Sequence, residues 1–231
     1  MRDLFGCVSL GRHYPRGGCL SAMKEQNILK DPYNIIITGV GGQGSVMASR
    51  VLSNMLSLYG FKITIGETFG ASQRGGSVMS HIRVSGCGTW SPQIPKGRAN
   101  LVVALEPVES LRVLMTYGNP EICILANIRP TYPVGVIAGD LSYPEPEDID
   151  KTLHTLAGQV LLIDATKEAV ELGNPILSNI IMIGAVCGLG LLPIGVKEFR
   201  SVIQNMIPAK HLEINVIAFE LGQRKSIVKI E

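Results

Sequence analysis

The residues of this chain best suited to chemistry lie in a glycine-rich segment, Gly39-Val40-Gly41-Gly42-Gln43-Gly44. Its glycines occupy positions one, three and six, as in the strand-to-helix turn that binds dinucleotides. Glycine permits positive φ and a close backbone approach, and the unpaired N–H groups of a helix starting at Ser45 suit an anion such as phosphate. The segment is not an ATP-hydrolysing P-loop, because Ser45 and Val46 replace its Lys and Ser or Thr. The candidate contacts are Gly39, Gly41, Gly42, Gln43 and Gly44.

A nicotinamide dinucleotide would also need an acid near the end of the second strand, to bind its ribose. Glu67 stands 23 residues after Gly44, in about that place. Three interpretations of the glycine loop remain open at this point. It could bind a dinucleotide, bind another anion, or form a tight turn packed against a partner protein.

A second glycine-rich polar segment runs from Glu67 to Ser77, and a plain Rossmann domain does not need one. It adds Glu67, Gln73, Arg74, Gly75 and Gly76 as candidate site residues, because the Arg74 fork can bind a carboxylate or phosphate. The sequences GVGGQG and GETFGASQRGGSVMSHIRVS closely resemble the gamma-type domain of 2-oxoacid:ferredoxin oxidoreductases, nearest the small subunit of the indolepyruvate type. The resemblance covers residues 34–222 and continues in WSPQIP (90–95), Glu106-Pro107, EIN (213–215) and AFELG (218–222).

The resemblance implies a pyruvate/ketoisovalerate oxidoreductase gamma domain within an enzyme that uses thiamine diphosphate and iron–sulfur clusters. That enzyme converts a 2-oxoacid and coenzyme A into an acyl-CoA, carbon dioxide and reduced ferredoxin. The resemblance implies that this chain holds no cofactor itself and that a large partner subunit carries the thiamine diphosphate and the clusters. We therefore expect a hetero-oligomer that reaches ferredoxin through the complex, and an inactive isolated chain that could form a homodimer.

The substrate and the role of the glycine loops are expectations of the same resemblance. Indolepyruvate is the first choice, followed by 2-oxoglutarate, pyruvate and branched-chain 2-oxoacids. The loop amides and the Arg74 guanidinium would suit the pyrophosphate of coenzyme A. No residue is singled out as catalytic. The alternatives are a stand-alone Rossmann-type NAD(P)-binding protein and a non-catalytic assembly subunit.

The composition restricts the possible partners. Charged residues make up 17% of the 231 residues, below the roughly 25% of ordinary soluble domains, which predicts a surface covered by a partner. The net charge is +2, and Lys and Arg are scattered, so neither nucleic acid nor a membrane surface is indicated as a ligand.

The cysteines and the N-terminus indicate a cytoplasmic protein. The five cysteines, at positions 7, 19, 87, 123 and 187, show no CxxC spacing, which predicts no metal or cluster site. Their odd number and isolation favour free thiols in a reducing compartment. The first 22 residues lack the apolar run of a secretory signal.

Hydrophobic periodicity predicts an α/β fold with a Rossmann-like, mostly parallel open sheet and a helical C-terminal part. We expect a disordered extension over residues 1–33 and one domain over 34–231. Residues 128–146 are expected to form an irregular loop with one short strand at most. Strands are expected at 34–40, 61–65, 78–84, 101–105, 122–125 and 160–163, and helices at 45–59, 108–115, 149–156, 175–192, 196–207 and 211–221.

Two further features need an explanation. No charged residue lies between Leu172 and Val196, and Gly184 and Gly188 form a GxxxG pattern, but Pro175 and Pro193 leave too few residues for a comfortable membrane span. A buried central helix is therefore expected. The strand at 78–84 places His81 and Arg83 on the face opposite Val78 and Ile82, which predicts a half-exposed strand and a non-catalytic, solvent or interface histidine.

Overall fold

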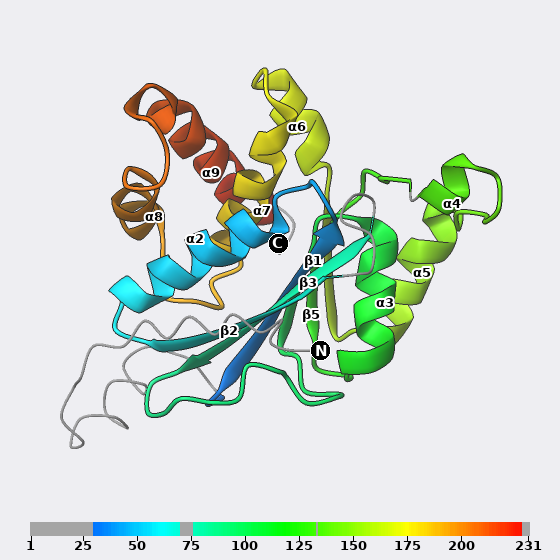
Figure 1. Ribbon diagram of the computed structural model, residues 1–231, viewed down its shortest axis with the longest axis horizontal. Helices are drawn as coiled ribbons and strands as arrows, with labels where there is room; N and C mark the ends of the chain where they lie inside the picture. Colours follow the sequence, from blue (N-terminus) through cyan, green and yellow to red (C-terminus); the bar gives the residue numbers. More distant parts are fainter. Residues whose placement is uncertain (1–29, 70–75, 133, 228–231) are drawn as a thin grey trace, which may run out of the picture.

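The computed structural model describes residues 30–69, 76–132 and 134–227 of the chain, and Figure 1 shows its arrangement. The described residues form one six-stranded sheet in the order β2-β3-β1-β4-β5-β6. Strands β1, β4, β5 and β6 are parallel, whereas β3 lies antiparallel between β1 and β2. The predicted mostly parallel open sheet is confirmed. The strands are β1 (Tyr33–Val40), β2 (Lys62–Phe69), β3 (Ser77–Ser85), β4 (Leu101–Ala104), β5 (Cys123–Asn127) and β6 (Gln159–Ile163).

Helices cover both faces of the sheet, as expected when parallel strands are joined by crossover connections (Figure 1). One layer holds α2 (Ser45–Leu58), α6 (Ala165–Glu171), α7 (Ser178–Gly188), α8 (Val196–Ile203) and α9 (Leu212–Ile227). The other holds α3 (Pro107–Tyr117), the short α4 (Val134–Ile137) and α5 (Pro146–Leu156). Two 3₁₀ turns, η1 (Pro175–Leu177) and η2 (Ala209–His211), precede α7 and α9.

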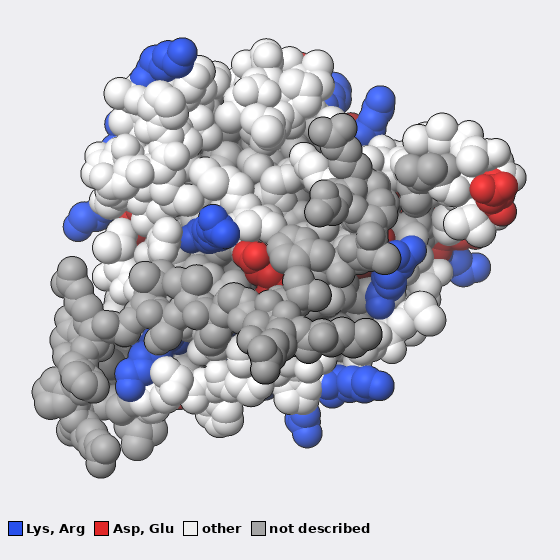
Figure 2. Space-filling view, viewed as in Figure 1, with Lys and Arg blue, Asp and Glu red and all other residues white. Residues whose placement is uncertain are grey.

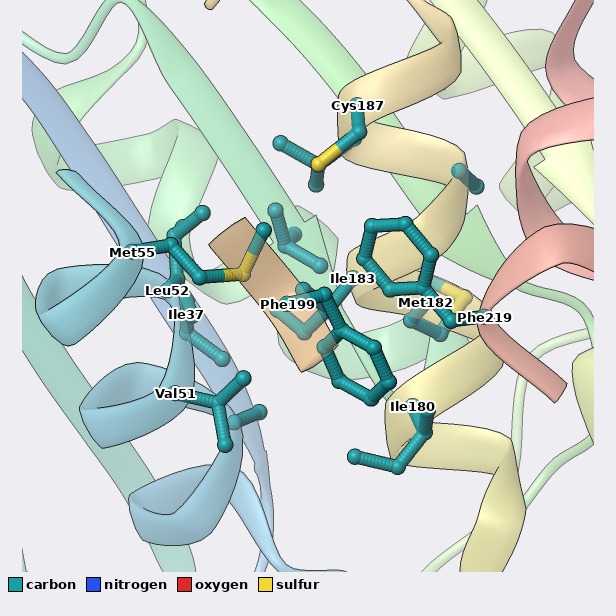
Figure 3. Close-up of a cluster of buried hydrophobic side chains, with 14 of the residues drawn as sticks. Ile37, Val51, Leu52, Met55, Ile180, Met182, Ile183, Cys187, Phe199 and Phe219 are labelled. Carbon is teal, nitrogen blue, oxygen red and sulfur yellow. The ribbon is translucent and has the colours of Figure 1, made fainter. Parts of the chain in front are cut away.

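The larger core lies between the sheet and the layer of α2, α7, α8 and α9 (Figure 3). Val51, Leu52 and Met55 of α2 belong to the same buried apolar cluster as Ile183 of α7. Phe199 of α8 and Phe219 of α9 stack with ring centroids 4.2 Å apart. This packing fixes the position of α2 relative to α7, which matters for the site described below.

The uncharged stretch from Leu172 to Val196 contains an internal helix, α7, as predicted. Helices α7 and α9 touch through glycines: a Cβ on Gly184 would lie 2.0 Å from the Phe219 carbonyl oxygen, and one on Gly222 would lie 1.9 Å from that of Ile181. The GxxxG pattern therefore serves a close helix crossing within the domain. Within the described residues, no helix is both long and apolar enough to cross a membrane.

The prediction that β3 is half-exposed is wrong, because the segment between β3 and β4 covers its outer face. His81 and Arg83 are 3% and 7% exposed. Arg83 donates from Nη1 to the Ser91 carbonyl oxygen at 3.1 Å, and its guanidinium lies 5.1 Å from the centre of the Trp90 ring. On the face of the sheet where α3 packs, the segment between β3 and β4 thus covers β3, which no helix covers there.

Other differences concern single elements. Helix α6 was not predicted, and residues 128–146 contain the helix α4 and the first residue of α5 instead of a short strand. The predicted helix at 175–192 is divided into η1 and α7. Cys123 and Cys187 are buried free thiols, whereas Cys87 is disulfide-bonded, contrary to the expectation.

Candidate anion site at the glycine loop

The glycine-rich segment forms the turn between β1 and α2, at the carboxyl edge of the sheet. Gly42 and Gly44 have φ values of +104° and +83°, which side-chain-bearing residues rarely adopt. The backbone therefore reverses tightly and starts α2 at Ser45. Open α/β sheets bind ligands at this edge, so the predicted loop lies at the expected place.

The Gln43 side chain joins the loop to neighbouring segments by hydrogen bonds. Its Oε1 accepts from the Val40 N–H at 2.7 Å, and its Nε2 donates to the Leu105 carbonyl oxygen and to Thr131 Oγ1, both at 3.0 Å. One amide thus joins β1, the end of β4 and the segment after β5. These hydrogen bonds occupy both ends of the Gln43 amide, which gives this predicted site residue a positioning role.

The start of α2 is open to an acceptor. Gly44 occupies the N-cap position and has no side chain with which to cap the helix, and the first turn contains no acidic residue. The N–H groups of the first helical turn have no partner within their own helix, and the helix dipole adds partial positive charge there. This helix start can therefore bind a phosphate or carboxylate group.

The end of the second glycine-rich segment is hydrogen-bonded to the first segment. The Gly41 N–H donates to the Gly76 carbonyl oxygen at 2.8 Å, just before β3 begins. The structure thus brings Gly76 together with the Gly39–Gly44 loop. The predicted site residues Gln73, Arg74 and Gly75 lie outside the described residues.

Glu67 lies away from the glycine loop. It belongs to β2 and pairs with Ser80 of β3, which in turn pairs with Ile37 of β1. A ribose-binding acid follows a strand that is adjacent and parallel to the first, but here β3 separates β2 from β1. This topology does not support Glu67 as a ribose-binding residue.

The start of α3, at the same edge, is closed by its own side chains. Glu106 is 2% exposed, and its Oε2 accepts from the Glu109 N–H at 2.9 Å, while Oε1 accepts from the Tyr143 hydroxyl. Glu109 accepts in turn from Ser77 Oγ at 2.5 Å. Burial raises the pKa of Glu106, and the hydrogen bonds from Tyr143 and Glu109 oppose that effect.

Sequence reasoning missed the role of Glu106, although a signal was present. A proline at the first helical position with an acceptor residue before it is typical of a helix start, and Glu106-Pro107 has this form. It also missed Asn127, whose amide donates to Thr166 Oγ1 and to the Leu105 carbonyl oxygen at this edge. Such contacts join distant segments and leave no local pattern.

His81 is remote from this chemistry. Its Nδ1 accepts from the Ile94 N–H at 3.4 Å, and its ring makes an edge contact with Tyr117. Burial lowers its pKa to about 4, so the ring is neutral near pH 7. His81 is therefore a core histidine and not the solvent-exposed one that the sequence predicted.

Comparisons with known proteins identify the family. Residues 34–224 match the model of the family described as pyruvate ferredoxin/flavodoxin oxidoreductase. The chain belongs to this family. It is 37% identical, over 191 residues, to the indolepyruvate oxidoreductase subunit IorB of Pyrococcus horikoshii, and the match covers 82% of this chain and 94% of that one.

Solved structures share the fold. The gamma subunit of a keto/oxoacid ferredoxin oxidoreductase from Geobacter sulfurreducens matches with a TM-score of 0.61 and 20% identity, over 85% of this chain and 99% of that one. The 2-oxoglutarate:ferredoxin oxidoreductase of Magnetococcus marinus, solved with 2-oxoglutarate, coenzyme A and succinyl-CoA, matches with a TM-score of 0.65 and 18% identity. That match covers 86% of this chain and 32% of the other.

Membership of the pyruvate ferredoxin/flavodoxin oxidoreductase family supports the predicted oxidoreductase subunit over a stand-alone NAD(P)-binding protein. Its relatives are named as subunits, which implies partner chains. Among the described residues, no group of three or more His, Cys, Asp or Glu side chains could hold a metal ion. In the view of Figure 2, Lys and Arg side chains are dispersed and form no continuous basic patch.

Proposed function

We propose that this chain is the small subunit of an indolepyruvate-type 2-oxoacid:ferredoxin oxidoreductase and holds the phosphate portion of coenzyme A at its glycine loop. The thiamine diphosphate and the iron–sulfur clusters belong to a large partner subunit. Bound thiamine diphosphate supplies the decarboxylation chemistry there. The residues of this chain bind and orient the thiol substrate and help to exclude water from the reaction.

The observation that carries this proposal is the uncapped start of α2, held rigid by Gln43. A pyrophosphate can accept hydrogen bonds from the N–H groups at a helix start, and the site has no acidic side chain in the first turn to repel it. The position agrees with the carboxyl edge at which α/β sheets bind ligands. Indolepyruvate is the proposed substrate because the IorB relative is named for it.

The test is reconstitution with candidate large subunits, followed by a dye-reduction assay that depends on both the 2-oxoacid and coenzyme A. We expect activity only in the complex, with indolepyruvate preferred over 2-oxoglutarate, pyruvate and branched-chain 2-oxoacids. Arg74→Ala should reduce activity about 10-fold or more while the complex still assembles, if the charge-assisted contact to phosphate that the sequence suggests for Arg74 is made. The matched control is Arg50→Ala, an exposed arginine on α2, which should retain nearly full activity.

Two outcomes would contradict the proposal. Tight NAD binding by the lone chain, with no partner found, would favour a dinucleotide-binding protein. A complex whose coenzyme A dependence is unchanged by loop variants would indicate an assembly subunit. A preference for another 2-oxoacid would correct the substrate without affecting the role of the loop.

A further inference from the structure

A pocket of about 530 Å³ lies at the amino edge of the sheet, opposite the carboxyl edge that holds the glycine loop. This edge is the one at which β1 begins in Figure 1. The lining of this amino-edge pocket includes Asn34 at the start of β1, Arg83 near the end of the antiparallel β3, and Asn100 just before β4. Asn119, in the loop after α3, also lines it. A pocket of this volume accommodates a small-molecule ligand.

Arg83 is a buried cation in the lining of the pocket, with 7% of its surface exposed. Of its five N–H groups, the one on Nε donates to Asn34 Oδ1 and one on Nη1 donates to the Ser91 carbonyl oxygen, each at 3.1 Å. The Trp90 ring offers the guanidinium a π face but no counter-charge. Within residues 30–69, 76–132 and 134–227, Arg83 forms no ion pair. Because buried charges are normally paired, Arg83 calls for an anionic partner.

The other charged residues of the lining do not balance Arg83. Lys30 and Glu121 form an ion pair with each other, so together they contribute no net charge. Arg98 and Asp31 also line the pocket, and both are exposed residues of opposite charge. The lining therefore keeps an excess of one positive charge, and the buried member of its three cations is Arg83.

Proline rings supply the apolar part of the lining. Pro32, Pro95 and Pro120 belong to three different segments that meet at the pocket. A guanidinium binds a carboxylate through parallel hydrogen bonds, and apolar rings stabilise the organic group that carries the carboxylate. Inorganic phosphate has no such group and would leave the proline rings without a contact.

We infer that the amino-edge pocket binds a small organic carboxylate, which places its carboxylate on Arg83 and its apolar group against the prolines. The ligand supplies the counter-charge that Arg83 lacks in the described part of the chain. The inference does not depend on the coenzyme A role proposed for the glycine loop, because the two sites lie at opposite edges of the sheet.

The first test is an NMR titration of the ¹⁵N-labelled full chain with phenylacetate as the probe. We expect the backbone amide signals of Gly97, Arg98 and Asn119 to shift, with a Kd of about 1 mM. Phenylacetamide, which keeps the ring but has no charge, and inorganic phosphate should each bind about 10-fold more weakly. Equal binding of phenylacetamide, or shifts confined to residues 39–44, would overturn the inference.

Two variants separate ligand binding from folding. Arg83→Gln should raise the Kd for phenylacetate about 10-fold or more, but Arg83 also holds the segment after β3. Arg98→Glu reverses a charge of the lining at an exposed residue whose backbone carbonyl, not its side chain, accepts from Asn34 Nδ2. It should raise the Kd about 5- to 10-fold without loss of stability in urea denaturation.

The matched control is Lys96→Glu, which makes the same charge change at an exposed residue outside the lining. It should change the Kd by less than about 2-fold, because exposed charges are screened by salt. Equal effects of Arg98→Glu and Lys96→Glu would show that the net charge of the chain, and not the pocket, attracts the probe. That result would overturn the inference.

The last test repeats the titration with the reconstituted complex, using NMR signals of the probe. The part of the binding that is lost in Arg98→Glu and kept in Lys96→Glu reports on the amino-edge pocket. This part should persist in the complex. Its loss on assembly would show that the partner subunit covers the pocket, and Arg83 would then be an interface residue and not a ligand-binding one.

Discussion

Helices α2 and α3 start at the same edge of the sheet, after adjacent parallel strands, and their first turns differ in one respect. In α3 the Glu106 carboxylate accepts the Glu109 N–H, and Glu109 adds a second acid to the first turn. In α2 the corresponding cap position is Gly44, and the first turn holds no acid. The helix that satisfies its own N–H groups has no need of an anion, whereas the other can take one from a ligand.

The difference shows how one fold divides structural and binding roles between equivalent positions. The closed start of α3 anchors Tyr143 and Ser77, and so ties later segments to the sheet. The open start of α2 contributes less to the stability of the isolated chain, because its donors have no protein acceptor at the cap. Stability and ligand binding should therefore respond in opposite ways to changes at the two helix starts.

The largest effect is expected from Gly44→Ala. A side chain at φ +83° is strained, and its Cβ would displace the Asn179 amide, so the free energy of unfolding should fall by about 2–4 kcal/mol. Gly60→Ala is the control, because Gly60 has φ +101° but open space around it, and it should cost only about 1–2 kcal/mol. Urea denaturation measures both. Equal losses of unfolding free energy in the two variants would show that the Asn179 side chain moves away from residue 44 at little cost.

Removing the cap of α3 should have the next largest effect. Glu106→Ala loses the bond to the Glu109 N–H and leaves the Tyr143 hydroxyl without its partner, so it should cost about 2–3 kcal/mol. Asp164→Ala removes a simpler cap, the bond to the Lys167 N–H at the start of α6, and should cost about 1 kcal/mol. Thermal denaturation of both variants compares them. A Glu106→Ala loss no larger than the control would mean that Tyr143 is not held by this contact.

Much of this arrangement could be predicted from local sequence. The run of isoleucines in β1, the glycines that follow and the amphipathic pattern of α2 identify the strand, the turn and the open helix start. Their signals lie within one short segment, where backbone preference and periodicity act together. The resemblance to the oxidoreductase family is strongest in the same segment and its continuation into β3, and it extends to residue 222.

The remaining features depend on contacts between segments far apart in the chain. Nothing near Gly44 indicates that Asn179 of α7 will lie against it, and nothing near His81 shows that residues 86–100 will cover β3. The insertion of β3 between β1 and β2 likewise has no local signature, so Glu67 was placed near the loop by analogy with a simpler sheet. Only the cap at Glu106 had a readable local signal that was missed.

A smaller effect should appear in the pH dependence of the closed start. Burial raises the pKa of Glu106 in the folded chain above its ordinary value of 4.5. Folding then favours the protonated form, so this contribution to stability is complete below about pH 4.5 and is lost as the pH rises through the folded pKa. Glu106→Gln removes the titration, and its stability relative to wild type should therefore improve between pH 4 and pH 8. A constant difference, measured by denaturation at several pH values, would contradict the direction of the shift.

The smallest and most informative change closes the open helix start. Val46→Asp puts a carboxylate into the first turn of α2, where it interacts favourably with the helix dipole, so the isolated chain should gain about 0.3–1 kcal/mol of stability. The same charge would occupy the region proposed for phosphate, so the complex should bind coenzyme A about 2- to 5-fold more weakly. Val108→Asp, at the equivalent position in α3, is the control. Because Glu109 already supplies an acid there, Val108→Asp should neither stabilise the isolated chain nor weaken coenzyme A binding by the complex. The introduced carboxylate and the phosphate of coenzyme A compete only if the phosphate binds at the start of α2. A gain in stability with undiminished coenzyme A binding would therefore mean that the phosphate binds elsewhere.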